Sequence, residues 1–132
     1  MNGRFVLSTD VQRETLEWGQ LGWISRPAMT EAQTLTVIEV TLEAGHGHNF
    51  HKHPDQEEVI YVMSGQIEQW LEQEKTLLKA GDSIFIKPDV VHASFNTGSE
   101  TARLLVSLGP CAGPDGYELV DVADQAPWNG LR

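Results

Sequence analysis

The chain has 132 residues, of which 40% are hydrophobic, and nineteen acidic against nine basic residues leave a formal net charge of −10. This length fits one hydrophobic core, so we expect residues 1–132 to form a single domain. The acidic balance repels phosphate groups, which argues against nucleic acid or a membrane surface as a partner. No apolar run reaches the ~18 residues of a membrane span and no basic, apolar leader is present, so we expect a cytoplasmic protein.

The first thirty residues carry the weakest pattern. Ser8, Thr9 and Asp10 are residue types that cap helices, so a short helix is predicted from there through about Trp18. A first strand is predicted over residues 21–25. We interpret this segment as a short N-terminal extension of the domain. Cys111 is the single cysteine, which excludes a disulfide framework and a cysteine-based zinc cluster.

From residue 34 the chain changes to short strand-like units. Residues 34–42 are rich in β-branched side chains, and Gly45 closes the unit with a turn. Comparable units follow at intervals of roughly ten residues, separated by Gly, Pro, Asp and Asn, over 59–63, 66–72, 76–78, 84–86, 92–95 and 103–108. This spacing indicates an all-β barrel or sandwich. Residues 109–116, with two prolines and three glycines, predict a loop that leads to an irregular tail packed against the barrel.

Four of the five histidines lie within residues 45–58, which suggests a metal site. His51 and His53 are two residues apart, and alternate side chains of a strand point to one face, so both imidazoles are predicted to converge inside the barrel. Glu58 begins the next strand near this pair, and His92 comes from a distant strand. Imidazole and carboxylate together suit a divalent ion of Fe, Mn, Ni, Zn or Co.

The spacing of these residues forms two motifs. The first has a glycine, five residues, His-x-His, four residues, a glutamate, six residues and a glycine, at Gly45, His51, His53, Glu58 and Gly65. The second has Gly-Asp, a short apolar strand, a turn, a histidine and an asparagine four residues later, at Gly81, Asp82, 84–86, His92 and Asn96. With these two motifs, over about residues 35–108, the chain resembles the cupin superfamily. It departs from the family at Lys87-Pro88-Asp89, where Pro-x-Gly is usual, and Asp tolerates such a turn.

The resemblance implies a double-stranded β-helix, or jelly-roll barrel, with His51, His53, Glu58 and His92 as metal ligands. It also implies dioxygenase, decarboxylase, isomerase or lyase chemistry, and small barrels of this kind often form homodimers, which we expect here. The motifs alone do not choose among these reactions, because one fold serves many functions.

Several other residues have competing interpretations. Glu57 is the alternative to Glu58, but its position does not fit the distance to Gly65. His46 and His48 are predicted to be exposed loop residues, with one of them at the barrel mouth as the alternative. Asn96 is expected to satisfy backbone groups of its turn. The four tryptophans are expected to serve packing.

The favoured function is a small metalloenzyme that acts on a small polar or carboxylate-bearing metabolite. The predicted substrate-binding residues are Ile60, which shares a strand face with Glu58; Ser94, which shares one with His92; and Arg103, the one cation of the last strand. Arg103 has the alternative of a solvated edge charge, and Tyr61 is an acid–base candidate only if its strand is rotated. The competing functions are a noncatalytic module that binds or senses a small molecule, and a metal-free scaffold.

Overall fold

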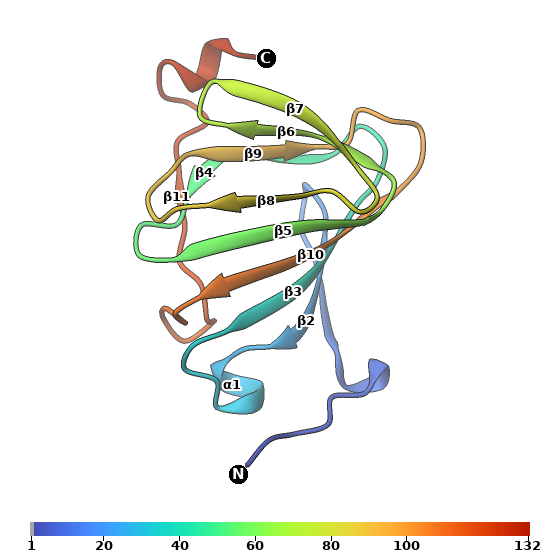
Figure 1. The fold of residues 1–132 in the computed structure, drawn as a ribbon, viewed down its shortest axis with the longest axis vertical. Helices are drawn as coiled ribbons and strands as arrows, with labels where there is room; N and C mark the ends of the chain where they lie inside the picture. Colours follow the sequence, from blue (N-terminus) through green and yellow to red (C-terminus); the bar gives the residue numbers. More distant parts are fainter. Residues whose placement is uncertain (1) are drawn as a thin grey trace.

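The strand-forming runs of the sequence assemble into two antiparallel sheets that together form a barrel (Figure 1). The computed structural model describes residues 2–132. The first sheet has the order β1-β2-β3-β10-β5-β8 and the second has the order β11-β4-β9-β6-β7. The strands are β1 (Gln12–Thr15), β2 (Gln20–Ser25), β3 (Thr36–Leu42), β4 (Gly47–Lys52), β5 (Glu57–Ser64), β6 (Gln66–Leu71), β7 (Glu74–Lys79), β8 (Ser83–Ile86), β9 (His92–Phe95), β10 (Ala102–Gly109) and β11 (Val120–Asp121). The predicted all-β jelly-roll barrel is therefore confirmed.

The main core lies between the sheets because the central strands alternate buried and less buried residues. In β3 the side chains of Ile38, Val40 and Leu42 are buried while those between them are partly exposed. β10 alternates in the same way, and its Leu104 and Val106 lie opposite Val40 and Ile38 in the antiparallel pair. This period of two is the burial pattern of a strand with one face in the core, and the units predicted from residue 34 onward correspond to observed strands.

The N-terminal helix prediction is wrong. Residues Ser8–Asp10 form a single 3-10 turn, η1, in which the Asp10 carboxylate accepts the N–H of Leu7. The chain then enters β1, which pairs along its length with β2 at the edge of the first sheet. The four side chains of β1 are all exposed, so a helix here would bury no apolar face, whereas pairing with β2 satisfies the backbone. The strand predicted at 21–25 is confirmed by β2, and a one-turn helix, α1 (Pro27–Thr30), follows it.

The C-terminal tail returns to the second sheet, as predicted. After the loop that follows β10, the short strand β11 pairs with β4. Trp128 begins a final 3-10 turn, η2 (Trp128–Gly130), and its ring stacks on Phe50 with 5.8 Å between ring centroids. Phe50 also contacts Trp70 and Phe95 in a second, smaller apolar cluster. None of the helices within residues 2–132 is long and apolar enough to cross a membrane.

The two glycines of the first motif differ in what surrounds them. Gly45 and Gly65 both have a positive φ, +84° and +77°. A side chain at Gly45 would meet no atom within 4 Å, whereas one at Gly65 would lie 2.8 Å from the backbone of Thr101 and Ala102. Gly65 is therefore required both for its conformation and for the close approach of β10.

These surroundings predict unequal costs of substitution. Gly45→Ala is expected to lower the free energy of unfolding by about 1 kcal/mol, the cost of a left-handed conformation alone. Gly65→Ala is expected to lower it by about 3 kcal/mol, because the backbone of the neighbouring strand must also shift. Urea unfolding of the two variants measures both values, and equal losses would contradict the close-packing explanation.

Candidate metal centre

The four predicted ligands come from three segments of the chain and meet inside the barrel. His51 lies on β4 opposite His92, the first residue of β9; His53 follows β4, and Glu58 lies near the start of β5. All four are buried. One ring nitrogen from each of the three histidines lies within 4.8 Å of the others. The Oε1 atom of Glu58 is 2.7 Å from Nε2 of His92 and 3.4 Å from Nε2 of His53.

Backbone carbonyl groups fix the tautomer of each of these histidines. The Nδ1–H of His51 donates to the backbone carbonyl of Asn49, at 2.6 Å. The Nδ1–H of His53 donates to the carbonyl of Glu118, at 2.8 Å. The Nδ1–H of His92 donates to the carbonyl of Val90, at 3.0 Å. Because a carbonyl oxygen only accepts, Nδ1 must carry the hydrogen in each ring, and Nε2 of the neutral ring keeps its lone pair. The three imidazoles are therefore held in the form that ligates a metal through Nε2.

Two buried polar atoms at this point lack hydrogen-bond partners. Within residues 2–132, neither Oε1 of Glu58 nor Nε2 of His92 has a partner in hydrogen-bonding geometry, although the two atoms are only 2.7 Å apart. Buried polar atoms are normally satisfied, because leaving them unpaired is costly. A cation that accepts lone pairs from both atoms removes this cost. Three imidazoles and one carboxylate form a donor set that fits a divalent transition ion.

Burial and charge set the protonation of this cluster. Burial lowers the pKa of His51 well below its usual value, so this ring is neutral at neutral pH. Burial by itself would raise the pKa of Glu58, but attraction to His92, when that ring carries a proton on Nε2 in place of a metal, outweighs it and holds the pKa of Glu58 well below its usual range. Burial likewise opposes protonation of His92, whose pKa is nevertheless raised by the Glu58 carboxylate. Glu58 is therefore an anion, which is the form that ligates a cation.

A cavity of about 50 Å³ adjoins these residues and is open on one side. Its lining contains His51, His53 and Glu58 together with many apolar side chains. The complete lining consists of Trp18, Leu21, Ile38, Val40, Leu42, His48, His51, His53, Glu58, Ser94, Leu104, Val106, Leu108 and Tyr117. The buried polar cluster is thus accessible from the cavity.

His48 lines this cavity, so it is not an exposed loop residue and matches the alternative that one of the two histidines lies at the barrel mouth. It lies on β4, and its ring stacks between Trp18 and His51, with centroid distances of 4.0 and 3.6 Å. Burial lowers its pKa to about 3. His46 precedes β4 and is exposed, as predicted. The pairing of β4 with β9 shifts register between His48 and His51, and such an irregularity lets residues three apart share a side, which strict alternation in the sequence does not indicate.

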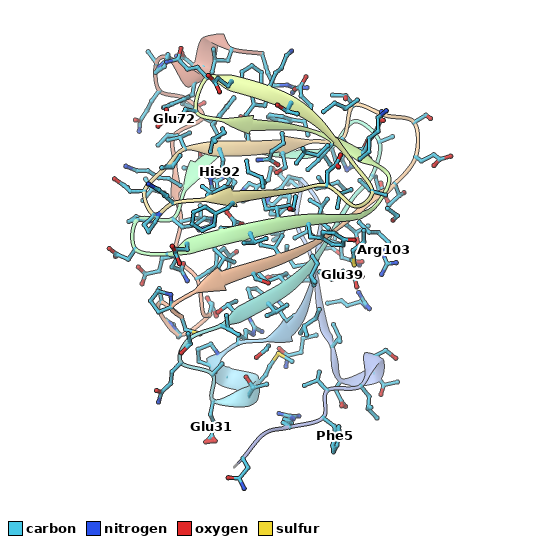
Figure 2. The ribbon with its side chains drawn as sticks, in the orientation of Figure 1. Phe5, Glu31, Glu39, Glu72, His92 and Arg103 are labelled. Atoms are coloured by element: carbon cyan, nitrogen blue, oxygen red, sulfur yellow. The ribbon has the colours of Figure 1, made fainter. Side chains whose placement is uncertain are left out.

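The structure places the three predicted substrate-binding residues differently. Ser94 lines the cavity, and its hydroxyl lies 2.6 Å from Oε1 of Gln69, to which it donates. Ile60 is buried in the main core and is not among the lining residues. Arg103 lies on the outer side of β10, with its guanidinium 3.0 Å from the Glu39 carboxylate, and Figure 2 shows the two side by side away from His92. Arg103 thus matches the alternative of a solvated charge.

The remaining alternatives have clear positions. Tyr61 and Glu57 are exposed on β5, whereas Glu58 is buried. The Asn96 amide donates to the carbonyls of Leu42 and Glu100. It also accepts the N–H of Gly98, so it satisfies backbone groups as expected.

Gln56 supports the site but was not predicted. Its buried amide donates to the carbonyls of Pro110 and Gly116, at 2.8 and 3.0 Å, and accepts the N–H of Glu118, at 3.1 Å. These bonds fix the loop whose Glu118 carbonyl orients His53 and whose Tyr117 ring lines the cavity. The partners lie more than fifty positions away in the sequence, so no local pattern around Gln56 indicates this role.

Comparison with known proteins agrees with the motif pattern. The family model described as "Cupin domain" matches residues 38–108. Protein SchB of Streptomyces halstedii is 31% identical over 109 residues, which cover 83% of this chain and 79% of that protein. Among solved structures, KdgF from Halomonas sp. has a TM-score of 0.73 at 20% identity, covering 83% of this chain and 94% of that chain. A predicted oxalate decarboxylase from Thermotoga maritima has a TM-score of 0.70 at 22% identity, covering 81% and 99%.

The hydrogen bonds of Gln56 predict that this residue affects metal affinity although it is not itself a ligand. Gln56→Leu is expected to weaken binding of Co(II) about 10-fold or more, because the Glu118 carbonyl no longer holds the His53 ring. Gln69→Leu is the matched control, since both glutamines are 2% exposed but Gln69 makes no hydrogen bond to the loop at 110–118. Calorimetric titration measures both affinities, and equal weakening in the two variants would contradict a specific role of Gln56.

Proposed function

The chain belongs to the cupin family, and from this we propose that it is a metal-dependent enzyme that acts on a small molecule. The single observation that carries the proposal is the set of three inward-facing Nε2 lone pairs beside the buried Glu58 carboxylate. A purely structural histidine cluster would be expected to pair these atoms with each other or with the backbone. Here the backbone takes only the Nδ1 side of each ring.

In this proposal His51, His53, Glu58 and His92 hold one divalent ion of Fe, Mn, Ni, Zn or Co. When bound, the ion supplies Lewis-acid or redox chemistry at the coordination positions that four protein ligands leave open. The chain itself orients the ligand and excludes water, since the cavity beside the donors is small and mainly apolar. The family resemblance supports dioxygenase, decarboxylase, isomerase or lyase chemistry.

A noncatalytic module that binds or senses a small molecule is the second candidate. It is favoured by the engagement of two polar side chains that line the cavity, Ser94 and His48. The Ser94 hydroxyl is engaged with Gln69, and the neutral ring of His48 is stacked between two other rings. The two candidates share the same metal site and differ only in turnover.

We also propose that the protein is a cytoplasmic homodimer. The dimer is supported by apolar side chains on the outer face of the first sheet, where Val59 lies opposite Phe85 and Tyr61 is also exposed. Burial of such a patch against a second copy would be favourable. Sedimentation as a monomer at micromolar concentration would contradict the dimer.

The proposed metal site predicts how many ions bind per chain and which histidine substitution lowers the metal affinity. The protein is expected to bind one divalent ion per chain, and His53→Ala is expected to weaken binding at least 100-fold because an imidazole ligand is lost. His46→Ala is the matched control, since His46 lies in the same histidine-rich segment but is exposed. Elemental analysis after dialysis and calorimetric titration give both numbers. Equal behaviour of the two variants, or far less than one ion per chain, would overturn the metal proposal.

Turnover separates an enzyme from a binder. The protein loaded in turn with Fe(II), Mn(II) and Ni(II) is incubated with a panel of small oxygen-bearing compounds, and oxygen uptake and product formation are followed by electrode and mass spectrometry. An enzyme is expected to convert at least one compound, with the conversion lost in His53→Ala and kept in His46→Ala. Binding of panel compounds without any conversion would favour the noncatalytic candidate.

A further inference from the structure

The two sheets give the cavity two chemically different sides. Of the four donors, His51 and His92 lie on β4 and β9 of the second sheet, His53 follows β4, and Glu58 is the second residue of β5, a strand of the first sheet. The opposite wall is formed by β2, β3 and β10 of the first sheet, and these strands contribute only aliphatic side chains to the lining, among them Val40 and Val106. A ligand whose oxygen faces the donors therefore has hydrocarbon on its other side.

Within the described part of the chain, the cavity offers no lysine or arginine to a second charged group of the ligand. Arg103 is turned outward to Glu39, and the Arg26 guanidinium lies over the Trp23 ring at 4.0 Å from its centroid. The formal net charge of −10 also opposes the approach of anions. A carboxylate or phosphate placed against the aliphatic wall would lose its hydration without compensation.

We infer that the site takes an uncharged ligand with an oxygen donor at one end and an apolar group beside it, rather than a ligand with a second anionic group. This inference rests on the proposed metal site. It narrows the sequence-based expectation of a polar or carboxylate-bearing metabolite to a ligand without a second anionic group. The cavity volume of about 50 Å³ fits an apolar group of a few carbon atoms, and the open side leaves room for the remainder of the molecule.

Hydroxamates test the inference, because one chelating group carries different side groups. Acetohydroxamate, butanohydroxamate and the monohydroxamate of succinic acid are titrated into the Co(II)-loaded protein, and binding is read from the visible cobalt bands and by calorimetry. Each buried CH₂ is expected to contribute about fourfold in affinity. Butanohydroxamate, with two more CH₂ groups, is therefore expected to bind about 15-fold more tightly than acetohydroxamate, and the succinic compound more weakly than either.

Two valine variants test whether the cavity wall causes the higher affinity for butanohydroxamate. Val106→Thr places a hydroxyl in the cavity wall with little change of shape and is expected to reduce the preference for butanohydroxamate at least threefold. Val37→Thr makes the same exchange on β3 at a position that alternates with the buried core residues and does not line the cavity, and is expected to leave the preference unchanged. Equal affinity for the three hydroxamates, or tightest binding of the succinic compound, would overturn the inference.

A metal-free arm separates failure of the inference from failure of the metal site. If Co(II) does not bind, the proposed metal function fails, and the ligand class is then tested with butanol and butyrate on the metal-free protein. Butanol is expected to shift the NMR signals of the Val40 and Val106 methyl groups, and butyrate at equal concentration is expected to leave them in place. Shifts with butyrate alone, or with neither compound, would contradict an uncharged, apolar ligand.

Discussion

The hydrogen bonds from Nδ1 of three histidines to backbone carbonyls are the constraint on which the candidate centre depends. The accepting carbonyls belong to Asn49, Val90 and Glu118, and they come from three segments that only the folded barrel brings together. Each bond fixes both the orientation of a ring and the position of its hydrogen. The rest of the cluster follows, because three inward lone pairs beside a buried carboxylate require a cation or a proton.

Two features of the barrel hold these histidines in place. Pairing of β4 with β9 sets His51 opposite His92, so the ladder that stabilises the second sheet also positions two donors. Gln56 ties down the loop that carries the Glu118 carbonyl, so the position of His53 depends on a segment after the last long strand. The first sheet contributes hydrocarbon to the same cavity. The strands that stabilise the barrel therefore also position the donors and line the cavity.

Much of this arrangement could be predicted from the sequence, because the relevant signals are local. The β-branched content of residues 34–42 and the regular spacing of turn residues predict the strands, and motif spacing predicts that the four buried donors meet. The features that escaped prediction depend on long-range structure. β1 forms because β2 offers an edge, and His48 faces the cavity because the β4–β9 register is irregular. The side chain of Arg103 would face the cavity only if its face of β10 pointed inward. Arg103 pairs with Glu39 on the outer side of the sheet instead.

The central claim is that His51, His53 and His92 present Nε2, with Glu58, to a single ion. Anomalous diffraction from crystals soaked in Co(II) tests it most directly. The account predicts one cobalt peak per chain, bound by Nε2 of all three histidines and by a carboxylate oxygen of Glu58, with each Nδ1 still donating to its backbone carbonyl. A peak bound through Nδ1, or no cobalt among these four side chains, would contradict it.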